Sequence, residues 1–126
     1  MNEKGGLTNI VKKSVTPDKP TISLLVSKLG DRKSFGQHHA DCNEPHFAIL
    51  FFNRNKEAAE VQICLGCNVL GSTILIPAQQ QGRQGKGKHI YYTRDGMSKQ
   101  FRHLINELIK KYRFSHPAEP NAPYDN

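Results

Sequence analysis

Two short apolar runs separated by a polar turn are the feature that most constrains the fold of this chain. Residues 47–52 read Phe-Ala-Ile-Leu-Phe-Phe, a run of strand length that is rich in aromatic and branched side chains. Residues 53–57 are polar and turn-prone. Residues 60–65 then alternate polar and apolar side chains, the period of a half-buried strand. The pattern predicts a central antiparallel hairpin over about residues 46–65.

The register of this hairpin follows from which side chains must share its buried face. Because a slip of one residue would send one apolar set to the wrong face, the numbers of paired residues must sum to an even value. A sum of 110 places His46 opposite Cys64, and a sum of 112 places Ala48 there. In either register His46 and Cys64 share the face opposite the apolar set. The apolar side chains of the predicted buried face are Phe47, Ile49, Phe51, Val61, Ile63 and Leu65.

All three cysteines of the chain lie near one end of this hairpin. Cys42 comes just before the first strand, and Cys64 and Cys67 end the second strand at a two-residue spacing. Thiolates at this spacing can bind one tetrahedral zinc ion, and a histidine can complete the four ligands. Register makes His46 the preferred fourth ligand and His39 the next. A set of three protein ligands would leave an open position for catalysis.

Two other interpretations use the same cysteines. Cys64 and Cys67 can form a reversible disulfide, although the residues after Cys67 do not predict the helix start that lowers a thiol pKa. The cysteines can also be buried apolar residues or form a structural disulfide. An odd number of cysteines argues only against a fully paired disulfide framework. The sequence leaves metal binding, inert packing and redox chemistry open.

A second candidate site is the basic loop over residues 78–88. Its glycines are spaced by Arg83, Lys86 and Lys88, which can wrap an anion with backbone amides and side chains. Tyr91 and Tyr92 follow and can stack on bases. The formal net charge of +7 is compatible with nucleic acid, an anionic surface, a phosphorylated ligand or no partner at all. Another protein is a further alternative as partner. The loop does not match the P-loop pattern, and a solvated hairpin loop is the favoured interpretation of it.

The remaining patterns predict an α+β fold. Residues 21–26, 72–76 and 89–93 are β-favouring runs, which we expect to be strands. Apolar residues then recur at spacings of three and four, which predicts an amphipathic helix over about residues 94–112, with Thr93 or Asp95 as its cap. We therefore expect an antiparallel sheet, built on the central hairpin, with this helix packed on one face. The apolar stripe comprises Met97, Phe101, Leu104, Ile105, Leu108, Ile109 and Tyr112.

The domain organisation is simple. Residues 1–20 are polar and predict a flexible N-terminal arm, residues 21–115 form one domain, and residues 116–126 form a flexible, proline-rich tail. No stretch is apolar enough to predict a membrane span, and Met1 does not begin a signal-peptide pattern. A full-length chain of this kind is expected in the cytoplasm, whereas a chain trimmed of an export signal would look the same.

The cysteine-containing stretch resembles a group of small bacterial proteins of uncharacterised function. Those proteins carry a Cys-x-x-Pro-x-His motif, an apolar strand, an Ile-Cys-x-x-Cys ending and a leucine-rich helix, and the resemblance covers about residues 40–112. It implies a shared role for Cys42, Pro45, His46, Cys64 and Cys67. It implies no reaction. The insertion over residues 79–88 departs from the compact spacing of the group.

Three hypotheses follow from the sequence. The first is a small non-enzymatic binding or structural module with a Cys/His cluster that zinc can stabilise. The second is a basic-loop protein that binds nucleic acid or another anion. The third is a thiol- or metal-dependent enzyme, although no serine, histidine and acid are placed as a triad: Ser98 and His103 fall on different helix faces.

Overall fold

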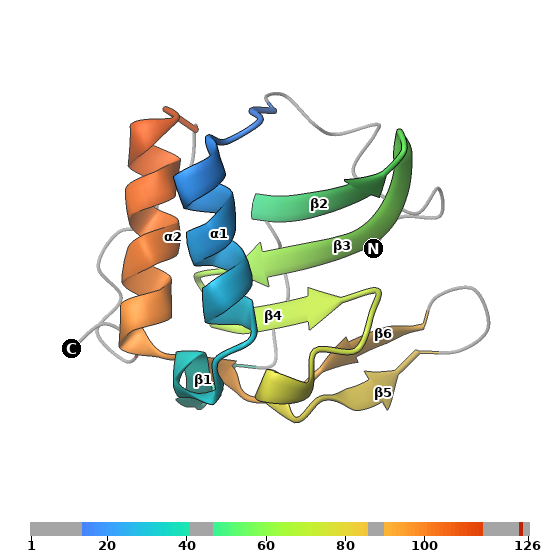
Figure 1. The fold of residues 1–126 in the computed structure, drawn as a ribbon. Helices are drawn as coiled ribbons and strands as arrows, with labels where there is room; N and C mark the ends of the chain where they lie inside the picture. Colours follow the sequence, from blue (N-terminus) through green and yellow to red (C-terminus); the bar gives the residue numbers. More distant parts are fainter. Residues whose placement is uncertain (1–13, 41–46, 86–89, 115–123, 125–126) are drawn as a thin grey trace.

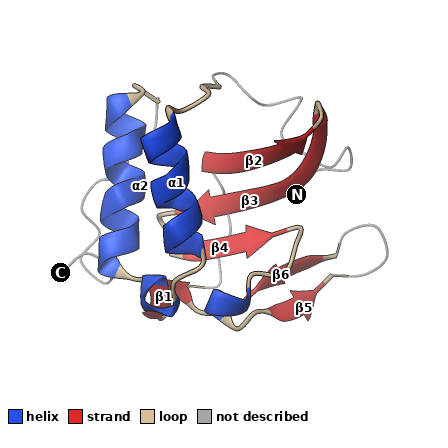
Figure 2. Cartoon of the chain, in the orientation of Figure 1, coloured by secondary structure: helices blue, strands red, loops and turns tan. Residues whose placement is uncertain are grey.

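The computed structural model describes residues 14–40, 47–85, 90–114 and Tyr124, and these residues form two helices packed on an antiparallel sheet (Figures 1 and 2). The five strands of this sheet are ordered β2-β3-β4-β6-β5, and a separate two-stranded sheet pairs β1 with β7. The predicted α+β class is therefore confirmed. The elements are α1 (Lys19–Leu29), η1 (Arg32–Ser34), β1 (Phe35–Gln37), β2 (Phe47–Asn53), β3 (Lys56–Cys64), β4 (Val69–Ser72), η2 (Pro77–Gln79), β5 (Gly82–Gln84), β6 (Tyr91–Thr93), β7 (Gly96–Met97) and α2 (Lys99–Lys111).

The central hairpin β2–β3 has the predicted even register. Phe47 pairs with Ile63 and Ile49 with Val61, so the paired numbers sum to 110 along most of the hairpin. Arg54 and Asn55 connect the strands, and both have positive φ, 52° and 68°. Two left-handed residues are what a two-residue type I′ turn requires, and this turn matches the right-handed twist of the strands. Local turn chemistry and side-chain pattern thus specify the same pairing.

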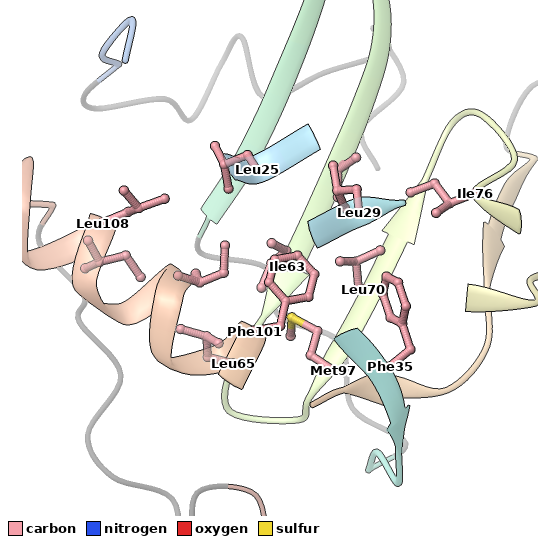
Figure 3. Packing of buried hydrophobic residues seen from close by; sticks show 13 residues of the cluster. Leu25, Leu29, Phe35, Ile63, Leu65, Leu70, Ile76, Met97, Phe101 and Leu108 are labelled. Atoms are coloured by element: carbon pink, nitrogen blue, oxygen red, sulfur yellow. The ribbon is translucent and has the colours of Figure 1, made fainter. Parts of the chain in front are cut away.

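The core lies between the two helices and the odd-numbered face of the hairpin. Figure 3 shows Leu25 and Leu29 of α1 beside Ile63 of β3, Leu70 of β4 and Phe101 of α2. Phe47, Ile49 and Phe51 of β2 are half-buried against the margin of this cluster, as the predicted face requires. Both helices therefore cover the same sheet face. The cluster comprises Leu25, Leu29, Phe35, Val61, Ile63, Leu65, Leu70, Ile76, Met97, Phe101, Ile105, Leu108 and Ile109.

The prediction of a strand over residues 21–26 is wrong, because this segment lies within α1. The side chain of Asp18 accepts a hydrogen bond from the backbone N–H of Thr21 at 3.0 Å and caps the helix, and Pro20 lies in its first turn. Leu25 and Leu29, four residues apart, are buried on the core side. Cap chemistry and helical spacing outweigh the β propensity of the run. The helix begins at Lys19, within the segment 1–20 that we expected to be an arm.

The C-terminal helix forms as predicted but begins later. Ser98, rather than Thr93 or Asp95, is its N-cap, and its hydroxyl accepts a hydrogen bond from the N–H of Phe101 at 3.2 Å. The start is displaced because Met97 pairs with Phe35 in the β1–β7 ladder. The apolar stripe of α2 packs on the core.

The strand predicted over residues 72–76 is displaced toward the N-terminus, to β4, and Ile74 and Leu75 are exposed. The loop expected over residues 78–88 is partly ordered as η2 and β5. Its anchor is Gln79, whose buried amide donates to the carbonyl oxygens of Leu70 at 3.2 Å and Asp95 at 2.7 Å. The predicted strand near residues 89–93 is confirmed as β6.

Candidate functional site

Cys64 and Cys67 lie at the turn that joins β3 to β4. Cys64 is the last residue of β3 and pairs with Val69, the first residue of β4, and Cys67 lies inside the turn. Both cysteines are buried, with 3% and 5% of their surface exposed. Residues 65–68 form the turn, so the two residues between the cysteines both lie in it. This spacing places both cysteines at one end of the hairpin, as the sequence predicted.

The segment that leads toward Cys42 is bound to this turn. The backbone N–H of Ala40 donates to the carbonyl oxygen of Cys67 at 2.9 Å. The amide of Asn68 donates to the carbonyl oxygen of His38 at 2.9 Å. Two hydrogen bonds thus hold residues 38–40 against residues 67–68, which brings the exposed His39 to the site. The ring nitrogen Nδ1 of His39 lies 3.0 Å from the carbonyl oxygen of Ala40.

Asn68 is the centre of the hydrogen-bond network at this end of the molecule. It is fully buried and has a left-handed backbone, with φ of 57°. Its side-chain amide also donates to the carbonyl oxygen of Met97 at 3.1 Å. Its side-chain oxygen accepts from the N–H of Met97 at 3.3 Å and from the guanidinium of Arg102 at 3.2 Å. One side chain thus connects the turn to the start of α2.

Arg102 is fully buried behind the same turn. Its guanidinium donates to the carbonyl oxygen of Leu65 at 2.7 Å and lies 5.1 Å from the centre of the Tyr124 ring. The Tyr124 ring lies 5.0 Å from the ring of His38. Tyr124 belongs to the segment 116–126 that we expected to be a flexible tail, yet its side chain is buried. The residues that pack this site, His38, Arg102 and Tyr124, therefore come from segments distant in the chain.

The sequence interpretation missed Arg102, although a signal for it was present. Ile105 and Ile109 follow Arg102 at three and seven residues, which places the arginine on the apolar stripe of α2. A charged side chain in such a position must be desolvated and satisfied by hydrogen bonds. The backbone carbonyl oxygens of a tight turn, such as that of Leu65, supply this need.

The cysteines are in different chemical states. Cys67 is disulfide-bonded, and Cys64 is a free, buried thiol. Cys42 and His46, the other predicted ligands, lie outside the described residues. Within residues 14–40, 47–85 and 90–114 there is no group of three or more metal-binding side chains. A sulfur atom in a disulfide is not a thiolate ligand, so a zinc ion would require the reduced form of Cys67.

The predicted anion-binding loop lies on different strands from the cysteines. Arg83 is exposed on the edge strand β5 and pairs with Tyr92 of β6. Lys86 and Lys88 lie outside the described residues. The cysteine turn joins β3 to β4, and β6 lies between β4 and β5, so the two candidate sites lie on different strands of the sheet.

A buried carboxyl group on β3 is a further feature that the sequence interpretation missed. Glu60 is 1% exposed, and its Oε2 accepts a hydrogen bond from the amide of Gln62 at 3.0 Å. Its Oε1 has no hydrogen-bond partner among the described residues. Burial, and next the nearby charge of Glu57, raise the pKa of this carboxyl. Glu60, Gln62 and Cys64 alternate along β3 and so lie on the sheet face opposite the helices.

In the described parts of the chain, neither helix has the length and apolar character needed to cross a membrane. Comparisons of the chain with protein-family models, curated proteins and solved structures find no match. The resemblance to small bacterial proteins therefore stays a prediction.

Proposed function

We propose that this chain is a small non-enzymatic structural or binding module in which a Cys/His cluster fastens the β3–β4 turn. The observation that carries the proposal is the pair of hydrogen bonds between residues 38–40 and residues 67–68. Because Ala40 bonds to Cys67, the chain lies next to Cys67 only two residues before Cys42. Cys42 is also the remaining cysteine once Cys64 is free, and we propose it as the disulfide partner of Cys67.

The same cluster can bind zinc when the disulfide is reduced. Cys42, Cys64 and Cys67 would then supply three thiolates, and His46 or His39 the fourth ligand. Zinc and the disulfide are alternative ways to fasten the same turn, since both need the sulfur of Cys67. A structural role is favoured over thiol catalysis, because the described residues contain no exposed free thiol: Cys64 is buried and Cys67 is paired.

The test combines thiol counting with metal analysis on the full chain, purified without a histidine tag. An oxidised sample, denatured before the assay, should show one reactive thiol. The variant Cys42→Ser should show two, because Cys67 loses its partner, and the matched control Cys64→Ser should show none. A sample purified under reducing conditions should show stoichiometric zinc, and a chelator should lower its melting temperature. Three free thiols without zinc, and a melting temperature indifferent to reductant and chelator, would overturn the proposal.

A second candidate function is the binding of an anionic ligand or nucleic acid at the β5–β6 hairpin. The supporting observation is that Arg83 is directly opposite Tyr92, so a cation and an aromatic ring share one side of an edge hairpin. Arginine and tyrosine side chains together can hold phosphate and a stacked base. Binding of single-stranded DNA and RNA at two salt concentrations tests this function, with Arg83→Ala as the variant. Affinity that is absent, or indifferent to salt, rejects it.

A further inference from the structure

The strand at one margin of the sheet has the sequence of an interior strand. β2 is seven residues long, Phe47–Asn53, and is the first strand in the order β2-β3-β4-β6-β5. In Figure 1 it forms the upper margin of the sheet. Six consecutive residues, 47–52, are apolar, a pattern typical of strands buried on both faces with neighbours on both sides. Among the described residues, however, only β3 pairs with β2.

Neither face of β2 is fully covered. Leu50 and Phe52, on the face opposite the helices, are 39% and 62% exposed. On the helix side, Phe47, Ile49 and Phe51 are only half-buried. Both apolar faces of this strand can therefore bury more surface if the sheet continues beyond it.

The outer edge of β2 also lacks the features that prevent edge pairing in monomeric proteins. Such edges usually carry a charge, a proline or an outward bulge. Residues 47–53 contain no charged residue and no proline, and the irregularity at Phe51 and Phe52 is in the pairing with β3. The unpaired backbone groups of such an edge are satisfied by water or by another strand. These features point to a strand as the occupant.

We propose that the outer edge of β2 pairs with β2 of a second copy of this chain, in an antiparallel register centred on Leu50. Two-fold symmetry makes such a strand pair self-complementary, and directly opposed residues point to the same face. Leu50 is then opposite Leu50 of the partner, and Phe52 is opposite Ala48 of the partner, so that a large side chain meets a small one. The two five-stranded sheets join into one continuous sheet.

Charge restricts where two copies of the chain can meet. The chain carries a formal charge of +7, so two copies repel each other over most of their surfaces. β2 is a strand without charge, and two copies can pair along it with no like charges directly opposed. The two-fold symmetry also gives a specific test. Residue 50 is the only position of the strand that lies opposite the same residue of the partner.

The mass of the full chain in solution tests the proposal. Light scattering over a range of protein concentrations should give a mass that approaches twice the chain mass of 14.2 kDa. Leu50→Lys should weaken association at least tenfold, because two lysines would face each other. Leu50→Glu should do the same. An equimolar mixture of the two variants should associate again, since opposite charges then meet at residue 50.

The matched control is Leu75→Lys, which changes a leucine of similar exposure, 55%, in the β4–β5 connection and should leave association unchanged. Far-ultraviolet circular dichroism should show that each variant remains folded. A monomer at every concentration overturns the proposal, and slow hydrogen exchange of those β2 amides that point away from β3 would then indicate a segment of the same chain on this edge. A dimer that Leu50→Lys leaves intact, or that the mixture fails to restore, overturns the register.

Discussion

The side-chain amide of Asn68 donates a hydrogen bond to the backbone carbonyl oxygen of His38 at 2.9 Å and joins two segments thirty residues apart in the chain. Asn68 also has the left-handed backbone, with φ of 57°, that ends the β3–β4 turn. Asparagine accepts this conformation more readily than most residues and supplies both donor and acceptor groups. One buried amide therefore makes several of the hydrogen bonds that hold the turn carrying Cys67.

Replacement of Asn68 should strongly destabilise the fold. Asn68→Ala leaves the carbonyl oxygens of His38 and Met97 without their donor and places a less tolerant residue at positive φ. We expect a loss of about 3 kcal/mol in the free energy of unfolding, measured by urea denaturation. Asn68→Gly keeps the backbone conformation and loses only the hydrogen bonds, so it should be about 1 kcal/mol less destabilising. A loss below 1 kcal/mol for Asn68→Ala would contradict the assigned network.

A glycine beside Asn68 gives an independent test of the same packing. A Cβ atom added at Gly96 would lie 2.7 Å from the carbonyl oxygens of both Asn68 and His38, which are backbone atoms with little room to move. Gly96→Ala should therefore lower the free energy of unfolding by about 2 kcal/mol. The control is Gly66→Ala in the same turn, where an added Cβ meets no atom within 4 Å. Equal melting temperatures for the two variants would show that the β7 contact is not tight.

The central hairpin could be predicted because several local signals agree. The apolar pattern of residues 47–52 and 60–65 requires an even register, and Ile49 indeed pairs with Val61. The C-terminal helix could also be predicted, because its apolar residues recur at helical spacing over residues 97–112. Periodicity over many residues is the most reliable signal in a single sequence.

The features that the sequence did not predict depend on hydrogen bonds of single polar side chains, which hydrophobic periodicity does not reveal. The prediction of a strand in place of α1 followed from the β-favouring composition of residues 21–26, whereas the Asp18 cap favours the helix. Gln79 lies in a loop by composition but is buried by its bonds to Leu70 and Asp95. The site itself was predicted only in part: the cysteine spacing indicated the turn, whereas Asn68, which holds it, has no periodic signal.

The disulfide at Cys67 should contribute to stability under oxidising conditions. Cys67→Ser removes the covalent bond, and we expect a loss of about 2–4 kcal/mol in the free energy of unfolding relative to the unchanged protein. In the presence of a reductant and a metal chelator the difference should nearly disappear, because neither fastening remains. Cys64→Ser is the control: it changes a buried free thiol, so with the chelator present its effect should be the same with and without reductant. If the two variants respond alike to reductant, the disulfide does not stabilise the turn.

The carboxyl of Glu60 should make its contribution to the free energy of unfolding less favourable as the pH rises. Burial raises its pKa in the folded state above the ordinary value of 4.5, so the fold favours the protonated form. The contribution of Glu60 is therefore most favourable below pH 4.5 and is lost as the pH rises through the raised pKa of the folded state. Glu60→Gln replaces the buried charge by a neutral amide of the same shape. It should be more stable than the unchanged protein at pH 7, and this advantage should shrink toward pH 4.

Urea denaturation at several pH values between 4 and 8 measures this effect. The matched control is Glu107→Gln on α2, where an exposed carboxyl lies 3.6 Å from Lys110. Because exposed ion pairs contribute little to stability, this variant should differ little from the unchanged protein in its free energy of unfolding. The contrary outcome is that the stability of Glu60→Gln relative to the unchanged protein is lower at pH 7 than at pH 4. This would mean that hydrogen bonds satisfy the Glu60 carboxylate in the fold. The unpartnered Oε1 and the burial of Glu60 argue for the opposite outcome.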